Sequence, residues 1–181
     1  MAGHNKWTQI KHKKGAVDAK RSKVFSMLGK SIAVEAKRCG GDKNDPGLRS
    51  AIDRARAANM PNDNIDRAVA RGAGVGGASY EVVLYEAYGP GGVAMMIEGI
   101  TDNKNRTTPE IKHLLSEYGA NLGGQGSAAW AFTKTVEGYT PNSTLPISPD
   151  DGQKLTDLIA ALEEHDDIKN IYTNASWLSL A

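Results

Sequence analysis

The sequence predicts an α+β protein, with an N-terminal three-helix bundle followed by an α+β sandwich that has a mainly antiparallel sheet and helices on one face. Apolar residues in the first 71 positions recur at helical spacing. Later segments of strand and helix character do not alternate regularly, as they would in a parallel α/β protein. A glycine-rich stretch separates these two parts. We therefore expect a helical domain over 1–71, a linker over 72–79 and an α+β domain over 80–181.

Three amphipathic segments predict the helices of the first domain. The first is expected over residues 16–39, where apolar residues form one stripe before a pair of glycines. The second begins with Asp45 as N-cap and Pro46 as its first residue. The third follows Pro61 and ends at Arg71.

The elements of the second domain are expected in the order β-β-α-β-β-α-β. Two strands joined by a Gly-Pro-Gly-Gly turn form a hairpin, and Thr107 or Thr108 caps the following helix. The expected ranges are strands 80–88 and 93–101, helix 108–118, strands 128–133 and 143–147, helix 151–164 and strand 168–173.

Length and composition exclude several classes of protein. The chain has 181 residues, 40% of them hydrophobic, which is enough for a packed core in each domain. No apolar run approaches the roughly 20 residues of a transmembrane helix, and none follows the basic N-terminus as in a secretory signal. The single cysteine, Cys39, allows no internal disulfide. We therefore expect a cytoplasmic protein with no membrane partner.

The net charge of +1 conceals two opposed halves. Residues 1–71 contain 16 Lys and Arg against 7 acidic residues, whereas residues 72–181 contain 6 basic and 14 acidic residues. Basic residues at this density favour nucleic-acid binding over a merely solvated surface, because each phosphate they neutralise releases counterions. The residues expected to contact nucleic acid are His4, Lys6, Trp7, Lys11, His12, Lys13, Lys14, Lys20, Arg21, Lys23, Arg49, Arg54 and Arg56.

The sequence allows two interpretations each for Trp7 and for the loop 103–106. Trp7 either stacks on a base or, as we prefer, anchors the basic arm to the bundle. The loop containing Asn103, Lys104, Asn105 and Arg106 is equally consistent with an anion or RNA contact before a helix and with a capped polar surface loop. The acidic residues Glu163, Glu164, Asp166 and Asp167 are interpreted as a solvated or protein-facing surface.

No pattern of catalytic or cofactor-binding residues stands out. There is no Ser-His-Asp, Cys-His or nucleophile-elbow arrangement, and the spacing of His4 and His12 fits no zinc site. Gly72, Gly74 and Gly77 match a dinucleotide motif, but they follow a helix and precede a strand, which is the wrong context. We therefore expect a protein that is not an enzyme and that binds no metal ion and no cofactor.

Several motifs, in order along the chain, resemble those of one family. They are Met1-Ala-Gly-His-Asn-Lys-Trp7, Ile10-Lys-His-Lys-Lys14, Ala57-Ala-Asn-Met-Pro61, Tyr88-Gly-Pro-Gly-Gly92, Thr101-Asp-Asn-Lys-Asn-Arg-Thr107 and Asp166-Asp-Ile-Lys-Asn-Ile-Tyr-Thr-Asn174. On these motifs the chain resembles the YebC/PmpR family. The resemblance implies a cytoplasmic, non-enzymatic regulator of gene expression. Members are described both as DNA-binding transcriptional regulators and as translation factors that help ribosomes through consecutive prolines.

The chain departs from the family pattern at two places. Members usually carry a third α+β domain inserted after the strand corresponding to 128–133, whereas here only residues 134–139 bridge that point. We therefore expect a short form whose inserted domain is absent near 134–142. The segment 124–126, Gly-Gln-Gly, stands where the family commonly has an acidic residue.

Our hypothesis is that the basic arm and bundle bind rRNA or tRNA on the ribosome, while the acidic domain contacts protein partners. RNA is favoured because the helices lack a clear recognition-helix turn and a long basic arm suits threading between RNA helices. The alternatives are a sequence-specific DNA-binding transcriptional regulator and a protein-binding adaptor.

Overall fold

The computed structural model describes residues 17–77 and 79–177. It contains two compact units, a helical unit of residues 17–83 and 99–105 and a sheet unit of residues 84–98 and 106–177. The division falls within the first two strands and not in the glycine-rich segment 72–79.

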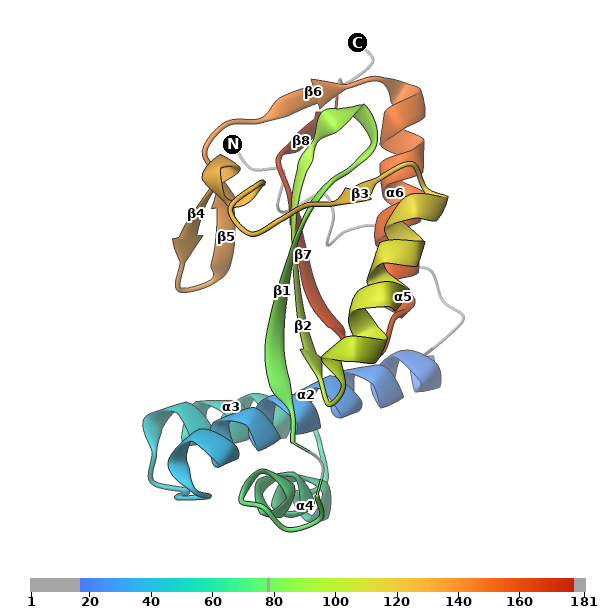
Figure 1. Cartoon of the computed structure of the whole chain (residues 1–181). Helices are drawn as coiled ribbons and strands as arrows, with labels where there is room; N and C mark the ends of the chain where they lie inside the picture. The colour runs from blue at the N-terminus through green and yellow to red at the C-terminus, as the bar shows by residue number, and fades with distance from the viewer. Residues whose placement is uncertain (1–16, 78, 178–181) are drawn as a thin grey trace. The chain divides into compact units, whose positions relative to one another are not determined.

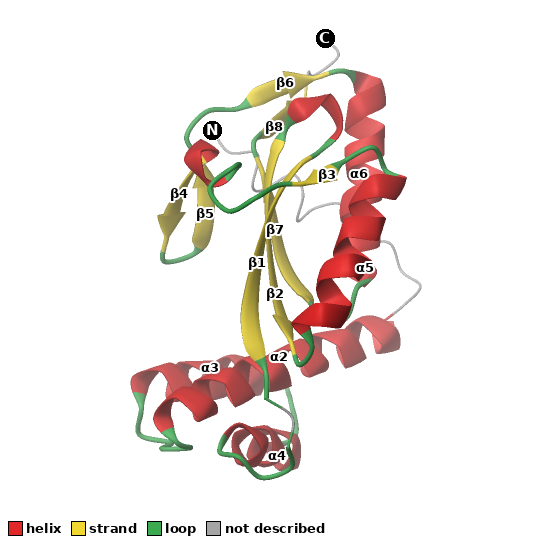
Figure 2. Ribbon diagram, viewed as in Figure 1, coloured by secondary structure: helices red, strands yellow, loops and turns green. Residues whose placement is uncertain are grey.

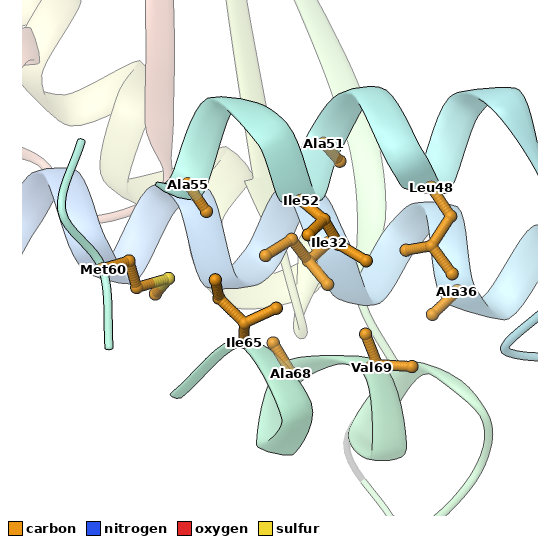
Figure 3. Packing of buried hydrophobic residues seen from close by; sticks show 10 residues of the cluster. All are labelled: Ile32, Ala36, Leu48, Ala51, Ile52, Ala55, Met60, Ile65, Ala68 and Val69. Atoms are coloured by element: carbon orange, nitrogen blue, oxygen red, sulfur yellow. The ribbon is translucent and has the colours of Figure 1, made fainter. Parts of the chain in front are cut away.

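The helical unit contains α2 (Val17–Cys39), α3 (Pro46–Ala57) and α4 (Asn62–Gly72). Helix α2 packs against both of the others. In Figure 3, Ile32 of α2 points toward Ile52 of α3 and toward the buried side chains of α4. The backbones of α2 and α4 come close at Gly72, where an added Cβ would lie 2.3 Å from the carbonyl oxygen of Ala33. Gly72 is therefore the last residue of a packed helix, although the sequence pattern placed it in the linker.

The predicted start of α3 at Asp45 and Pro46 and the predicted end of α2 at Cys39 are confirmed. The Oδ1 atom of Asp45 accepts hydrogen bonds from the N–H groups of Gly47 at 2.9 Å and Leu48 at 3.1 Å. These bonds, together with one from Arg38, hold the pKa of Asp45 below its ordinary value. Helix α2 ends before Gly40, whose φ of 63° favours glycine.

The sheet unit is built on four strands in the order β3-β1-β2-β7. The strands are β1 (Glu81–Tyr88), β2 (Ala94–Thr101), β3 (Asn121–Leu122) and β7 (Ile168–Thr173). β1 and β3 are antiparallel, with Ala87 opposite Leu122. Helices α5 (Lys104–Glu117) and α6 (Pro149–Glu164) lie on one side of this sheet (Figure 2). The predicted α+β class, with a mainly antiparallel sheet, is confirmed.

Smaller elements complete the unit (Figure 1). β4 (Phe132–Thr135) and β5 (Gly138–Pro141) form an antiparallel hairpin, and β6 (Leu145–Ile147) pairs in parallel with β8 (Ala175–Trp177). Short 3₁₀ helices occupy Pro90–Gly92 and Ala129–Ala131. A cluster of Ala94, Met96, Ala128, Ala131, Phe132 and Tyr172 forms a core between β2, β7 and the start of the β4–β5 hairpin.

The boundaries differ from the sequence expectations at several points. Helix α5 starts at Lys104, so neither Thr107 nor Thr108 is its cap. Thr107 is buried and its hydroxyl donates to Asp167 at 2.7 Å. The strand expected over 128–133 begins only at Phe132, because a 3₁₀ turn precedes it. The strand expected over 143–147 covers three residues, and β3, β5 and β8 were too short for hydrophobic periodicity to indicate them.

Candidate nucleic-acid interface

Part of the predicted interface lies outside the described residues. This part comprises His4, Lys6, Trp7, Lys11, His12, Lys13 and Lys14. Their contact with nucleic acid, and the role of Trp7, stay predictions.

The remaining predicted cations of the arm lie near the start of α2. Lys20 and Arg21 are exposed, whereas Lys23 is half-buried. The guanidinium of Arg21 lies 5.2 Å from the centroid of the Phe25 ring, a distance that allows a cation–π interaction.

Helix α3 brings two of its three predicted cations to one face. Arg49 and Arg54 both line an open hollow of about 500 Å³ along the helix. Arg54 is oriented by Ser50, whose hydroxyl oxygen accepts a hydrogen bond from Nη1 at 2.8 Å. Arg56 lies 3.7 Å from the carboxylate of Asp53, which offsets part of its charge, and Asp53 itself lines the hollow beside Arg49 and Arg54. Arg49 and Arg54 are therefore the better placed of the three for contact with a phosphate backbone.

Sequence reasoning did not single out the cations of α4. Arg67 and Arg71 are exposed and lie four residues apart on this helix. They line a groove of about 350 Å³ between α2 and α4, together with Lys30 of α2. The i, i+4 spacing of two arginines was a signal available in the sequence, because such residues share a helix face.

The predicted anion loop is in fact the approach to α5 and its first turn. Asn103 donates its backbone N–H to the hydroxyl of Thr101 at 2.9 Å, whereas Lys104 and Asn105 already belong to the helix. Arg106 forms an ion pair with Asp167, with 2.8 Å between Nη2 and Oδ2. The positive charge of Arg106 is thus balanced inside the sheet unit.

Asp167 is buried, with 3% of its surface exposed. Expecting it in an acidic surface at the end of the last helix was wrong, because Arg106 and Thr107 both bind its carboxylate. No sequence pattern indicates this pairing, since the partners lie about 60 residues away.

The glycine-rich loop before β4 is held by a carboxylate that sequence reasoning also missed. Glu86 of β1 accepts hydrogen bonds from the backbone N–H groups of Gly126 at 2.7 Å, Ala128 at 2.7 Å and Ala129 at 2.8 Å. Burial opposes ionisation, but the three donors outweigh it and keep the pKa of Glu86 below its ordinary value. Although segment 124–126 has no acidic residue of its own, it lies against one supplied by β1.

Within residues 17–77 and 79–177, no three His, Cys, Asp or Glu side chains gather as a metal site requires. Within the same residues, no helix is both long enough and apolar enough to cross a bilayer.

The fold and the distribution of charge define an α+β protein with a cationic helical unit. Two family models match the chain, one over each of these parts. The model described as the TACO1/YebC protein N-terminal domain matches residues 5–75, and the model of the TACO1/YebC second and third domain matches residues 80–138 and 134–175. The chain belongs to the TACO1/YebC family, as the sequence motifs indicated.

Individual relatives support the same assignment. A protein of Dictyoglomus turgidum is 38% identical over 237 aligned positions, covering 96% of this chain and 95% of the relative. One from Geobacter sulfurreducens is 54% identical over 136 positions, covering 74% of this chain and 55% of the relative. Both are named probable transcriptional regulatory proteins. A crystal structure of a conserved hypothetical protein from Aquifex aeolicus aligns with a TM-score of 0.87 and 32% identity, covering 96% of this chain and 98% of that one.

The length of one alignment is relevant to the expectation that this chain lacks an inserted domain. The 237 positions aligned with the Dictyoglomus protein exceed the 181 residues of this chain. That relative therefore contains residues with no counterpart here. The family-model match divides at 134–138, at the β4–β5 hairpin.

Proposed function

We propose that this chain is a non-enzymatic regulator of gene expression whose helical unit binds RNA on the ribosome and helps synthesis through stalling sequences such as consecutive prolines. The observation that carries the RNA contact is the pair Arg49 and Arg54, which share one open face of α3. The charge of the chain supports it, because residues 1–71 contain 16 of the 22 Lys and Arg. The ribosomal role follows from the resemblance to translation factors of the family.

A DNA-binding transcriptional regulator is the second candidate. Its support is the name of the relatives, probable transcriptional regulatory protein, and the connection between α3 and α4. This connection spans only residues 58–61 and so has the length of a helix-turn-helix turn, although the sequence pattern had indicated no such turn. α4 would then be the recognition helix. Its first two turns carry the exposed Asp63 and Asp66, and although Lys43 pairs with Asp66 at 2.9 Å, Asp63 would place a negative charge close to the phosphates of a duplex. This placement favours RNA contact through α2 and α3 over base reading by α4.

In this proposal the sheet unit positions the protein or contacts protein partners. Trp130 supports such a contact, because 67% of its surface is exposed while its indole N–H is already bound to the carbonyl oxygen of Ser127 at 2.9 Å. A rigid, exposed indole is typical of an interface anchor.

The test compares cosedimentation with purified ribosomes and binding to promoter fragments, each between about 50 and 200 mM salt. The double variant Arg49→Gln/Arg54→Gln is expected to weaken ribosome binding and to lower the slope of log affinity against log salt by about 1 for each lost contact. Lys112→Gln/Lys154→Gln removes the same charge from exposed positions on α5 and α6 and should leave both quantities unchanged. Specific promoter binding without ribosome association would overturn the RNA proposal in favour of the second candidate.

A further inference from the structure

The groove between α2 and α4 combines positive charge with an apolar wall. Its volume is about 350 Å³, within the range of small-ligand sites. Lys30, Arg67 and Arg71 supply the charge, and Phe25 and Met60 supply apolar surface. Among the described residues that line it, none is acidic.

The two arginines of the groove are oriented by neutral oxygen atoms. Nε of Arg67 donates to the carbonyl oxygen of Asp63 at 3.3 Å, and its Nη2 donates to the amide oxygen of Asn64. Nη1 of Arg71 lies 3.4 Å from the hydroxyl of Tyr80. These contacts hold the guanidinium groups without neutralising them. A positioned guanidinium is well suited to binding phosphate through paired hydrogen bonds.

A glycine adjoins the apolar wall of the groove. Phe25 is half-buried and packs against the bundle core, and Met60 lies across the groove on the chain entering α4. Gly29 of α2 also lines the groove, and an added Cβ there would sit 3.7 Å from Cε of Met60. A larger side chain at this position would occupy the space. The Arg21 guanidinium lies 5.2 Å from the centroid of the same ring, so a base on this wall would pack beside Arg21, and guanidinium planes as well as aromatic rings stack on bases.

A second hollow of about 350 Å³ adjoins the first, with Arg71 and Tyr80 lining both. It is also lined by Lys37, whose Nζ donates to the hydroxyl of Ser79 at 2.6 Å. Its described lining residues include no carboxylate either. The positive surface therefore continues past Arg71, as a groove that follows a sugar–phosphate backbone requires.

We propose that the groove between α2 and α4 binds one unpaired nucleotide of an RNA strand. Its phosphate contacts Arg67 and Arg71, and its base packs against Phe25 and Met60. An unpaired nucleotide is specified because a base within a duplex is stacked on its neighbours and cannot reach this wall. This inference rests on the proposed function of the helical unit as an RNA-binding module, to which it adds a subsite for single-stranded RNA.

The test fills the groove without changing its charge. Gly29→Leu places a side chain beside Met60, whereas the control Gly29→Ala adds a Cβ that makes only ordinary van der Waals contact. The probes are a fluorescent oligouridylate of about 12 nucleotides and an RNA duplex of the same length. We expect Gly29→Leu to weaken oligouridylate binding by about 5- to 100-fold, the effect of losing one base contact. Duplex binding, and both affinities of Gly29→Ala, should stay at the wild-type level.

A second variant keeps the proposal testable if Gly29→Leu unfolds in a thermal melt. Arg67→Gln/Arg71→Gln should lower the salt slope of oligouridylate binding by about 1.4, or 0.7 for each phosphate contact. An unchanged slope overturns the subsite. If folded Gly29→Leu binds oligouridylate like the wild type, or loses duplex binding equally, the subsite is overturned while the proposed function stands. If the wild type binds neither RNA, both proposals fail.

Discussion

Glu86→Gln is expected to destabilise the sheet unit strongly, because the native carboxylate binds three backbone N–H groups at once. One carboxylate oxygen accepts from Ala128 and Ala129, and the other accepts from Gly126. A glutamine whose oxygen takes the first position keeps two neutral hydrogen bonds, but its NH₂ group then faces the N–H of Gly126. Only 7% of Glu86 is exposed, so water cannot replace the lost acceptor well.

The size of the effect follows from these bonds. A hydrogen bond to a charged group contributes about 1.5–3 kcal/mol, and a neutral one about 0.5–1.5 kcal/mol. Loss of one charged bond and weakening of two others gives a loss of about 3–5 kcal/mol in the free energy of unfolding. For a chain of this size, each kcal/mol lowers the melting temperature by roughly 2–4 °C.

Chemical and thermal unfolding of the variant test this reasoning. Glu137→Gln makes the same chemical change at an exposed position and serves as the control. A loss below about 1 kcal/mol for Glu86→Gln would refute the assigned role of the three bonds.

The pH dependence supplies an independent check. The folded-state pKa of Glu86 lies below its ordinary value of 4.5. The stability that its ionised form contributes is therefore complete above pH 4.5 and is lost as the pH falls through the lowered folded value. The difference between wild type and Glu86→Gln should shrink on acidification, and a difference that grew would contradict the assignment.

Three further substitutions probe other contacts. Asp167→Asn should reduce unfolding free energy by about 1–3 kcal/mol in urea, since it removes the counter-charge of the half-exposed Arg106, and an unchanged urea midpoint would argue against this ion pair. Asp45→Ala removes the N-cap of α3 and should lower its helicity in circular dichroism, with a smaller loss of stability than Glu86→Gln; full helicity would contradict the capping role. Gly138→Ala should lower the melting temperature by at least several degrees, because its Cβ would lie 2.1 Å from the Tyr172 hydroxyl at a φ of +126°, and an unchanged melt would show that the hairpin relaxes freely.

The sequence was most informative where a structure depends on neighbouring residues. Asp45 followed by Pro46 marked the start of α3, and the glycines after Cys39 marked the end of α2. In both cases the interacting atoms lie within a few residues of each other. The strand-like apolar segments and the Gly-Pro-Gly-Gly turn between them likewise located the β1–β2 hairpin to within one residue at each end.

The sequence was uninformative where a side chain depends on a distant partner. Glu86 binds backbone N–H groups about 40 residues away, and every residue type except proline offers such a donor, so no pattern identifies them. Asp167 resembled a surface acid because its partner, Arg106, belongs to another element. Of the candidate interface, the basic character of the helical unit was predictable from charge alone. The hydrogen bonds of Arg67 to Asp63 and Asn64 depend on the side-chain conformations within α4. The groove that Arg67 lines forms only when α4 packs on α2.

The β4–β5 hairpin has a consequence for how this fold can be altered. Thr135 pairs with Gly138, and between them Val136 is fully exposed at the tip. The outgoing and returning strands are thus already side by side, so the polypeptide between them can change length at a cost of only about 0.6 kcal/mol for each doubling. A folded reporter domain with adjacent termini could be spliced between Val136 and Glu137 without breaking a strand pair. The same tip is a natural point of exchange, where evolution can gain or lose an entire module while β4 and β5 keep their register.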